Sequence, residues 1–386
     1  MLEGRRRLVL VVGARPNFVK AAAVLDALAE YPRIEATLVH TGQHYDANLS
    51  NVFFEELGIR EPDVHLQVGS GTHAAQTGRI MQEFERYLMD QAKRGATVDR
   101  VVVVGDVNST LACTIVATKM QIPVAHVEAG LRSFDRSMPE EINRIATDAL
   151  CDLLLCSEPA GVENLRREGR PASEIELVGN VMIDTLFGYI EKAQNRSILE
   201  DLGLLPGGYG VVTMHRPANV DDPARLARLV DVMTEISREL PLVFAVHPRT
   251  SQRLGACRLT SRIDAGRILT LGPQGYLDFL CLTSQAKLVI TDSGGLQEET
   301  TALGVPCLTL RRNTERPITV EEGTSTLVGD DAELLRDCVR DVLDGDYPVG
   351  RCPELWDGRA GRRVAAVLAG ALGVAAAETP RALRAA

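Results

Sequence analysis

Short apolar runs without polar alternation recur along this chain and constrain its fold more than any other feature. They comprise residues 8–12, a run ending at His40, and residues 101–104, 124–127, 210–214, 242–246, 268–271, 288–290 and 307–310. Such runs are typical of strands that are covered on both faces in a parallel sheet. Helical patterns separate them, beginning with the amphipathic stretch 16–30. The alternation predicts an α/β protein with two doubly wound domains in tandem.

The length of the chain also favours two domains, because 386 residues exceed what one ordinary hydrophobic core accommodates. We place the first domain at residues 1–182 and the second at residues 183–355, with the crossover near residues 179–184. From residue 356 onward the sequence predicts a last helix, followed by a frayed tail after Ala375.

Charge and cysteine content exclude several classes of protein. The 42 basic and 52 acidic residues give a net charge of −10, and no basic face is evident. Nucleic acid and anionic membranes are therefore unexpected partners. We expect no signal peptide and no transmembrane segment, since no apolar stretch has the required pattern. The eight cysteines have no CxxC spacing, which indicates neither a zinc site nor a disulfide framework and favours a reducing cytosol.

Residues 288–299, with the sequence LVITDSGGLQEE, are the strongest candidate for ligand binding. The apolar run turns at Asp292, Ser293, Gly294 and Gly295 and then enters a helical pattern. That turn places free backbone N–H groups and a helix N-terminus together, and both attract phosphate oxygens. Glu298 and Glu299 follow within reach of hydroxyls on the same ligand, so a diphosphate-linked ribose or sugar fits. An ordinary strand-to-helix turn is the plainer alternative.

Three acids of the first half are candidates for proton transfer. Ligands of open parallel sheets bind beyond the carboxyl ends of the strands. Asp106 and Glu128 each follow a strand there, and Glu140 opens the next helical pattern. Acids that converge in a cleft raise one another's pKa and can transfer protons. Asp106 and Glu140 could instead be N-cap or first-turn acids. For Glu128 both interpretations stay open, since an unpaired acid directly after an apolar strand is costly.

Cations and histidines occupy other strand ends. Arg15 and Lys20 follow the first strand, and two cations near a helix start suggest a phosphate or carboxylate partner, although they could simply balance nearby acids. His215 ends the first strand of the second half, and His247, which precedes a proline, is better explained as structural. The first strand ends in GARPN and not GxGxxG, and GxxxxGK[ST] and HExxH are absent. We therefore expect no redox cofactor, no ATP and no metal.

A series of motifs resembles the non-hydrolysing UDP-N-acetylglucosamine (UDP-GlcNAc) 2-epimerases and spans nearly the whole chain. They are GARPN at 13–17 with Lys20, HTGQHYD at 40–46, GD at 105–106, HVEAGLR at 126–132, PEEINR at 139–144, GN at 179–180, HRP at 215–217, TDSGGLQEE at 291–299, and TERP at 314–317 with EG at 322–323. The resemblance implies the GT-B fold: two Rossmann-like domains with a cleft between them, and a last helix, residues 356–386 with its tail, that packs back on the first domain.

The resemblance also implies an activity. It is the reversible epimerisation at C2 that converts UDP-GlcNAc to UDP-ManNAc, through elimination of UDP, a 2-acetamidoglucal intermediate and re-addition. The family further implies a cytoplasmic homodimer that associates through its first domain and supplies cell-surface polysaccharide synthesis.

Site roles follow from the same resemblance. Asp106, Glu128 and Glu140 would form the acid–base group, and His215 would join this catalytic set by stabilising the leaving diphosphate with Arg15 and Lys20. The remaining substrate-binding residues would be Arg144, His247, Tyr276, Ser293, Gly294, Gly295, Glu299 and Arg316. Gln43 and His44 match part of a site where many bacterial members bind a second, activating UDP-GlcNAc.

Departures from the family pattern leave alternatives open. Residues 69–76 lack the basic residue of the activating site, which puts allosteric activation in doubt. The loop between Arg132 and Pro139 is short, Ala149 stands where histidine is common, and Arg312 where an acid or small residue is common. The alternative functions are a hydrolysing epimerase that releases ManNAc and UDP, a GT-B glycosyltransferase, and a catalytically silent nucleotide-sugar sensor.

Overall fold

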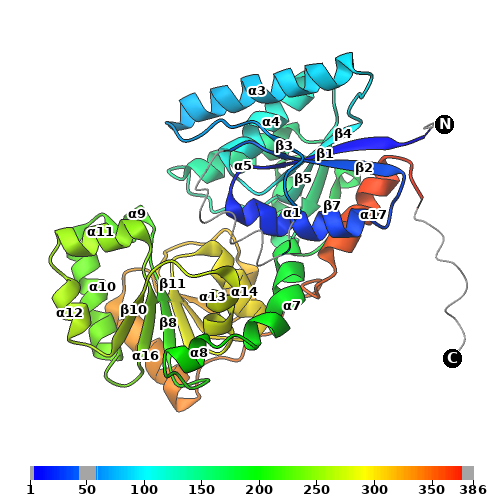
Figure 1. The fold of residues 1–386 in the computed structure, drawn as a ribbon. Helices are drawn as coiled ribbons and strands as arrows, with labels where there is room; N and C mark the ends of the chain where they lie inside the picture. The colour runs from blue at the N-terminus through cyan, green and yellow to red at the C-terminus, as the bar shows by residue number, and fades with distance from the viewer. Residues whose placement is uncertain (1–3, 43–57, 59, 376–386) are drawn as a thin grey trace, which may run out of the picture. The chain divides into compact units, whose positions relative to one another are not determined.

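The computed structural model describes residues 4–42, 58 and 60–375, and the chain divides into two compact units (Figure 1). Unit 1 comprises Met1–Thr185 and Leu355–Ala386, and unit 2 comprises Leu186–Glu354. Each unit contains one parallel sheet with helices between successive strands. The predicted fold class of two doubly wound, Rossmann-like α/β domains is confirmed.

The sheet of unit 1 has seven strands in the order β3-β2-β1-β4-β5-β6-β7. They are β1 (Arg6–Val12), β2 (Ile34–His40), β3 (Val64–His65), β4 (Arg100–Val104), β5 (Val124–Ala129), β6 (Leu153–Cys156) and β7 (Ile175–Leu177). All pairings are parallel. Residues 101–104 and 124–129 are buried throughout, as expected for strands covered on both faces.

Helices cover both faces of this sheet (Figure 1). They are α1 (Arg15–Leu28), α3 (His73–Lys93), α4 (Asn108–Lys119), α5 (Pro139–Leu150), α6 (Pro159–Arg167), the short 3-10 helix Ala172–Glu174, and α17 (Ala360–Ala371). Helix α7 (Val181–Gln194) begins in unit 1 and continues into unit 2. Helices α3, α4 and α5 pack side by side on one face, and α1 and α17 pack together on the other. A Cβ on Gly361 of α17 would lie 2.5 Å from the Ala23 carbonyl oxygen, so only glycine permits this approach to α1.

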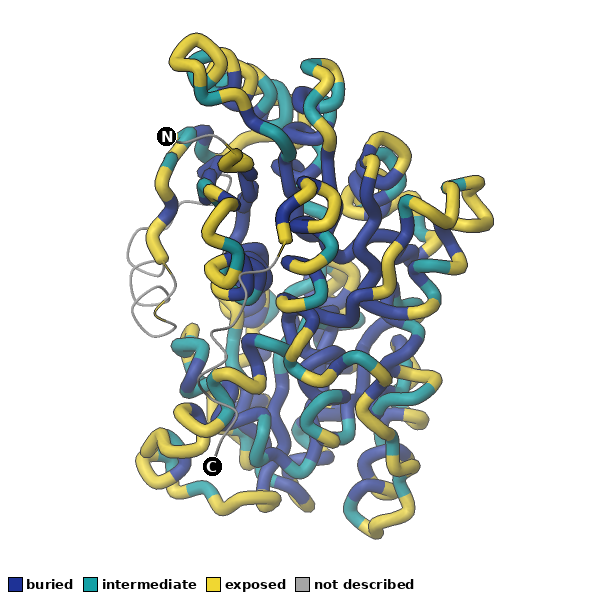
Figure 2. Tube along the Cα trace, turned by 90° about the vertical axis from the view of Figure 1, so that its right-hand side faces the viewer, coloured by how far each residue is buried: buried dark blue, intermediate teal, exposed yellow. Residues whose placement is uncertain are grey.

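The sheet of unit 2 has six parallel strands in the order β10-β9-β8-β11-β12-β13. They are β8 (Gly210–Thr213), β9 (Leu242–Ala245), β10 (Ile268–Leu271), β11 (Leu288–Thr291), β12 (Cys307–Thr309) and β13 (Ser325–Leu327). The helices are α8 (Ile198–Asp201), α9 (Pro217–Val220), α10 (Pro223–Ile236), α11 (Pro248–Ala256), α12 (Thr260–Asp264), α13 (Tyr276–Ser284), α14 (Gly294–Leu303), α15 (Ile318–Glu321) and α16 (Ala332–Asp344). Apolar side chains of the strands and of α10 and α16 form its core. Figure 2 marks the buried residues along the Cα trace in dark blue.

Strand order indicates where a ligand of each unit is expected to bind. The strands that follow β1 in sequence are first added on one side of it and, from β4 onward, on the other. In unit 2 the same change of side occurs between β8 and β11. Helices on opposite faces leave a crevice at such a switch point, beyond the carboxyl ends of the strands. The residues after β1, β4, β8 and β11 are therefore the ones whose side chains matter for binding.

Candidate active site

Glu128 occupies a strained position at the carboxyl edge of unit 1. Its φ of 75° lies in the left-handed region, and the β5–β6 register shifts between Val127 and Ala129. A non-glycine residue held this way costs about 1–3 kcal/mol, and such strain concentrates at functional sites. The strand was predicted to end at residue 127, but it continues through this bulge to Ala129. The Glu128 carboxylate is buried and forms an ion pair with Lys20 of α1.

Asp106 follows β4 and is held by α5. Its carboxylate forms an ion pair with Arg144 at 2.5 Å, and Asn143 donates to its backbone carbonyl at 2.9 Å. The N-cap of α4 is Val107, so the alternative that Asp106 caps this helix is wrong. Glu140 lies exposed in the first turn of α5, a position that fits either a first-turn acid or a group that meets substrate.

The first switch point brings several predicted residues together. A Cβ on Gly105, the residue between β4 and Asp106, would lie 3.8 Å from Glu128 Oε2 and 3.9 Å from Lys20 Nζ. Lys20 therefore has a carboxylate partner within the chain. The side chain of Arg15 lies outside the described part of the structure, as do Gln43 and His44, so their predicted roles stay predictions.

A buried cluster that sequence reasoning missed fixes the backbone around these acids. His126 of β5 contacts the Gly105 carbonyl oxygen through Nε2 at 2.8 Å and Asp148 of α5 through Nδ1 at 2.7 Å. Asp148 also accepts from the Gly130 N–H at 3.0 Å and pairs with Arg132 at 2.7 Å. Burial raises the pKa of Asp148, but His126 and Arg132 lower it to a value below its ordinary one. One carboxylate thus anchors segments on either side of Glu128.

Asp292 organises the second switch point, at the end of β11. Its fully buried carboxylate accepts hydrogen bonds from the backbone N–H groups of His215 and Arg216, at 3.1 and 2.9 Å, and from Asn219 Nδ2 at 2.9 Å. Burial raises the pKa of Asp292, but His215 and these donors hold it below its ordinary value. The sequence indicated Asp292 only as a turn residue, and its partners lie 73 to 77 positions away.

His215 is oriented by Asp292. Its Nδ1 lies 3.0 Å from Asp292 Oδ1, while its side chain is 41% exposed. A carboxylate at Nδ1 fixes the hydrogen there and leaves Nε2 for a ligand. The ring of His247 lies 5.6 Å away, and its Nδ1 accepts from the Arg249 N–H at 3.2 Å as the N-cap of α11. Burial and the neighbouring His215 lower the pKa of His247. This cap bond supports the structural interpretation of His247.

The N-terminus of α14 is partly exposed and lies beside Arg316 and Glu315, which carry opposite charges. Ser293 is its N-cap and makes no side-chain cap bond, and Ser293 and Gly295 are partly exposed. A Cβ on Gly294 would lie 3.1 Å from Arg316 Nη1, so the guanidinium is adjacent to the first helical turn. Arg316 forms ion pairs with Glu298 at 2.6 Å and with Glu315 at 2.7 Å. Helix N–H groups beside an arginine suit a diphosphate.

Glu299 lies further along α14, where it meets Tyr276 of α13. The Tyr276 hydroxyl donates to Glu299 Oε1 at 3.5 Å. Burial and, to a smaller extent, the neighbouring Glu298 raise the pKa of Glu299 to about 7. The pKa of Tyr276 is also raised, by burial and by Glu299. Two groups that can hydrogen-bond to hydroxyls are therefore adjacent, and one of them lies on the helix whose N-terminus is at Gly294.

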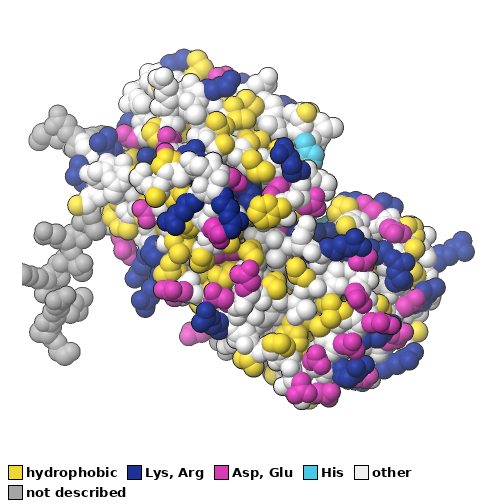
Figure 3. All heavy atoms as spheres, turned by 180° about the vertical axis from the view of Figure 1, so that it is seen from behind, with side chains coloured by type: hydrophobic (Ala, Val, Ile, Leu, Met, Phe, Trp, Pro, Cys, Tyr) yellow, Lys and Arg dark blue, Asp and Glu magenta, His cyan; other side chains and the backbone are white. Residues whose placement is uncertain are grey.

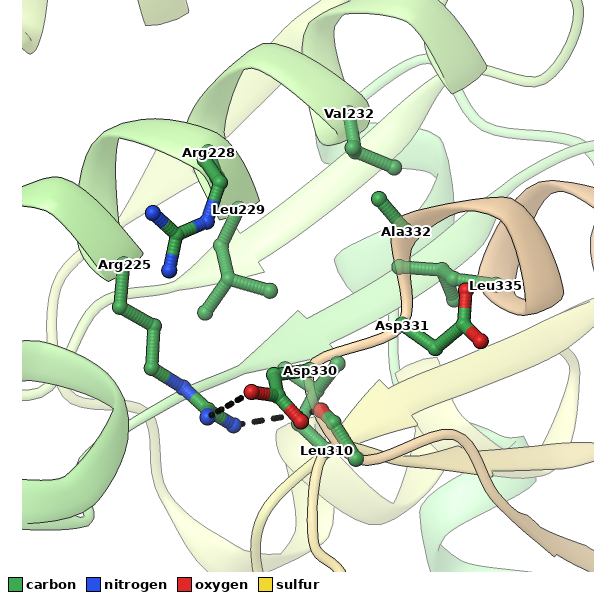
Figure 4. Close-up of a pocket in the computed structure, with 10 residues that line it drawn as sticks. Arg225, Arg228, Leu229, Val232, Leu310, Asp330, Asp331, Ala332 and Leu335 are labelled. Carbon is green, nitrogen blue, oxygen red and sulfur yellow. Dashed lines mark hydrogen bonds and ion pairs between the residues drawn. The ribbon is translucent and has the colours of Figure 1, made fainter.

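Further pockets lie away from the switch points, one at α6 and β7 in unit 1 and one between α10 and α16 in unit 2. The pocket between α10 and α16 is lined by Arg225, which pairs with Asp330 at 3.4 Å and donates to the Gly329 carbonyl at 3.2 Å (Figure 4). Arg312 forms an exposed pair with the same Asp330. Within the described ranges, no His, Cys, Asp and Glu side chains cluster in a way that could hold a metal ion. On the face in Figure 3, basic and acidic side chains are interspersed. No described helix has the length and apolar character to cross a membrane.

Fold and site together define a two-unit α/β protein with acids at the switch point of unit 1 and a helix N-terminus beside an arginine at that of unit 2. The UDP-N-acetylglucosamine 2-epimerase family model matches residues 26–369. The chain therefore belongs to this family, which confirms the family resemblance in its sequence.

Individual relatives match over most of the chain. The UDP-N-acetylglucosamine 2-epimerase of Methanocaldococcus jannaschii is 40% identical, over 94% of this chain and 98% of that protein. The crystal structure of the M. jannaschii UDP-GlcNAc 2-epimerase in complex with UDP-GlcNAc and UDP superposes with a TM-score of 0.83, covering 94% of this chain and 99% of that one. The UDP-2,3-diacetamido-2,3-dideoxy-D-glucuronate 2-epimerase of Pseudomonas aeruginosa is also 40% identical, over 87% and 92% of the two chains.

Proposed function

We propose that this chain interconverts UDP-GlcNAc and UDP-ManNAc by epimerisation at C2, without net hydrolysis. The observation that carries the proposal is family membership over residues 26–369. The similar M. jannaschii structure, described as a complex with UDP-GlcNAc and UDP, supports this substrate. Asp106 and Glu128, at the ends of neighbouring strands, support chemistry that moves protons.

The reaction divides into an elimination and its reversal. A base removes the C2 proton, the C1–O bond to UDP breaks, and the C1–C2 double bond of 2-acetamidoglucal forms. UDP then re-adds at C1 while an acid returns a proton to the opposite face of C2. Asp106, Glu128 and Glu140 are the proposed acid–base group, because the step needs proton carriers on both faces of one carbon.

Unit 2 supplies the proposed UDP-binding groups. The amide groups at Ser293, Gly294 and Gly295 receive phosphate oxygens, and Arg316 adds positive charge beside them. Glu299 and Tyr276 receive ribose hydroxyls. His215, held by Asp292, faces the departing diphosphate through Nε2. Such preorganised donors act where charge develops in the transition state. The further groups in the proposed binding set are Arg15, Lys20, Arg144 and His247, and no metal or cofactor is required.

A second candidate substrate is a UDP-diacetamido-glucuronate. The P. aeruginosa relative that carries this name is as similar to the chain, at 40% identity, as the M. jannaschii epimerase. Both sugars bear a 2-acetamido group and a diphosphate at C1, so the proposed chemistry is the same. The groups that contact C3 and C6 of the sugar would differ.

Proton NMR in deuterated water tests the proposal with the two nucleotide sugars as parallel substrates. UDP-ManNAc carrying deuterium at C2, formed from UDP-GlcNAc alone, is the expected result. Free ManNAc with UDP would assign a hydrolysing epimerase instead. Turnover of the glucuronate alone would assign the second substrate. An absence of turnover without an acceptor would leave a transferase or a sensor.

We further propose how the chain is organised in the cell. Residues 1–182 form the proton-transfer domain, residues 183–355 the UDP-binding domain, and residues 356–386 the helix and tail that return to the first domain. The Trp356 indole, which donates to the Ser157 carbonyl at 3.1 Å, supports that return.

All eight cysteines are free thiols, which supports a cytoplasmic location. A homodimer through the first domain is expected, and light scattering of the purified chain measures it.

A further inference from the structure

Phe134 is presented to solvent in an unusual backbone conformation. It lies in the loop between β5 and α5, its side chain is 76% exposed, and its φ is 57°. A bulky residue in the left-handed region is an outlier that neighbouring contacts must hold in place. The loop follows Glu128 directly along the chain and leads into the helix that carries Glu140. The exposed ring therefore belongs to the carboxyl edge where the proposed acids lie.

Glu141 holds this loop through three hydrogen bonds. Its Oε1 accepts from the Phe134 N–H at 2.9 Å. Its Oε2 accepts from the Ser133 N–H at 2.9 Å and from the Ser133 hydroxyl at 3.0 Å. Only 1% of Glu141 is exposed, so these bonds form away from water. A buried carboxylate that receives two backbone amides fixes the loop at the position of the aromatic residue.

The same carboxylate holds the guanidinium that meets Asp106. Arg144 donates to Glu141 through Nη2 at 2.6 Å and Nε at 3.0 Å, and its Nη1 reaches Asp106 at 2.5 Å. Burial raises the pKa of Glu141, but the Ser133 N–H and Arg144 lower it to a value below its ordinary one. Glu141 is therefore an anion that orients Arg144. The two neighbouring acids of the PEEINR motif thus differ, since Glu140 is exposed and Glu141 is buried.

We propose that Glu141 is a positioning residue that holds Arg144 against Asp106 and holds the 133–138 loop so that Phe134 packs on the sugar of the bound nucleotide sugar. This inference rests on the proposed function and adds a specificity contact to it. The C–H face of a pyranose is apolar, and an aromatic ring that stays exposed in the free protein gains contact area by covering it. An exposed phenylalanine without a role is the ordinary alternative, and the experiments distinguish the two.

The three hydrogen bonds from Ser133 and Phe134 to Glu141 form a clamp on the loop. Hydrogen exchange of the full chain tests this clamp without reference to activity. Glutamine at Glu141 keeps the size and one acceptor oxygen, but its NH₂ group cannot accept from Arg144. We expect the 133 and 134 amides of Glu141→Gln to exchange about 10-fold faster, since each loses a hydrogen bond to a charged acceptor. The matched control is Glu163→Gln, whose carboxylate pairs with Arg167 on the exposed surface of α6. Equal exchange in the wild type and Glu141→Gln would overturn the clamp.

Kinetics with UDP-GlcNAc test the two consequences of the clamp separately. Glu141→Gln should lower kcat by about 10-fold or more, as expected when an acid–base group loses its geometry, with UDP affinity unchanged. Phe134→Ala, an exposed substitution that should leave folding intact, should raise KM about 5-fold or more with kcat and free-UDP affinity nearly unchanged, because only sugar contact is lost. An unchanged KM in Phe134→Ala would overturn the sugar contact, and an unchanged kcat in Glu141→Gln would overturn the positioning role.

The two experiments also separate this inference from the proposed function. A wild-type chain that turns over neither nucleotide sugar would overturn the function and with it the catalytic role of Glu141. The hydrogen exchange of residues 133 and 134 would still establish or remove the structural clamp. If Glu141→Gln fails to fold, Ser133→Ala removes one of the three bonds to Glu141, and a faster exchange at residue 134 supports the clamp while unchanged exchange counts against it.

Discussion

Replacing Gly294 by alanine tests whether the side chains packed against the first turn of α14 need the space that glycine leaves. A methyl group there would lie 2.7 Å from Glu315 Oε1 and 3.1 Å from Arg316 Nη1. Both side chains are buried, and ion pairs tie them to Arg311 and Glu298, so neither can retreat freely. Forcing an extra methyl into a filled site typically costs about 1–3 kcal/mol. A cost of about 2 kcal/mol lowers the Tm of a domain of this size by roughly 4–8 °C.

The same substitution should weaken UDP binding. Movement of Arg316 removes a charged donor beside the helix N-terminus, and a hydrogen bond to a charged group contributes about 1.5–3 kcal/mol. The Kd of UDP should therefore rise roughly 10- to 150-fold. Titration calorimetry with UDP, at a temperature where calorimetric unfolding shows the variant to be folded, measures this change.

A control substitution separates the contact from a general effect of alanine. Gly188 lies exposed in α7, and a Cβ there meets no atom within 4 Å. Gly188→Ala should leave the Kd of UDP unchanged and stabilise the helix by up to about 1 kcal/mol. The reasoning is refuted if the Tm of Gly294→Ala and its Kd for UDP both equal those of the wild type.

The remaining predictions concern the acids, the pH dependence and metals. Asp106→Asn, Glu128→Gln and Glu140→Gln should each lower turnover by about 10²-fold or more while UDP still binds, and a variant with near-normal turnover does not belong to the acid–base group. Because the pKa of Glu299 is raised to about 7, its carboxylate forms as pH rises past that value; UDP-GlcNAc affinity should increase between about pH 6 and pH 8, and Glu299→Gln should flatten that increase. Turnover should persist after exhaustive chelation and without nicotinamide, and activity that returns only with one divalent ion would contradict this.

Most central strands could be predicted from the sequence, whereas three of the four edge strands could not. Residues 101–104 and 288–290 were placed within one residue of β4 and β11, because strands buried on both faces read as continuous apolar runs. The edge strands β3, β7 and β13, the interior strand β6 and the helix α3 were missed. β3 has two residues and β7 has three, which is too short for any periodicity to show. Helix α3 buries one narrow stripe, Gln76, Ile80, Phe84 and Leu88, whose four-residue spacing is a helical signal that could have identified it.

Site residues were predictable where a motif coincides with the end of a strand. The residues that form hydrogen bonds and ion pairs with them were not predictable. Glu128 was singled out because an acid directly after an apolar strand is costly, and it lies at a strained bulge. Asp148, Asp292 and Glu141 were missed as organising residues. Each looks like an ordinary helix or turn acid in sequence, and its role depends on groups brought together by the fold, such as His215 and Asp292, 77 positions apart. Pairings of that kind follow from strand order and not from local spacing.

Buried ion pairs at both switch points are better explained by chemistry than by stability. Removing a charge pair from water costs several kcal/mol per ion, and apolar replacements are often neutral or stabilising by about 1–4 kcal/mol. Lys20 with Glu128 and Arg316 with Glu298 are nevertheless almost fully buried. Both pairs lie beside the carboxyl ends of the strands that flank a switch point, where a ligand needs charge already in place. Their cost to the fold is understandable if these charged side chains bind or react with a nucleotide sugar. The substitutions described above test the two sites one at a time.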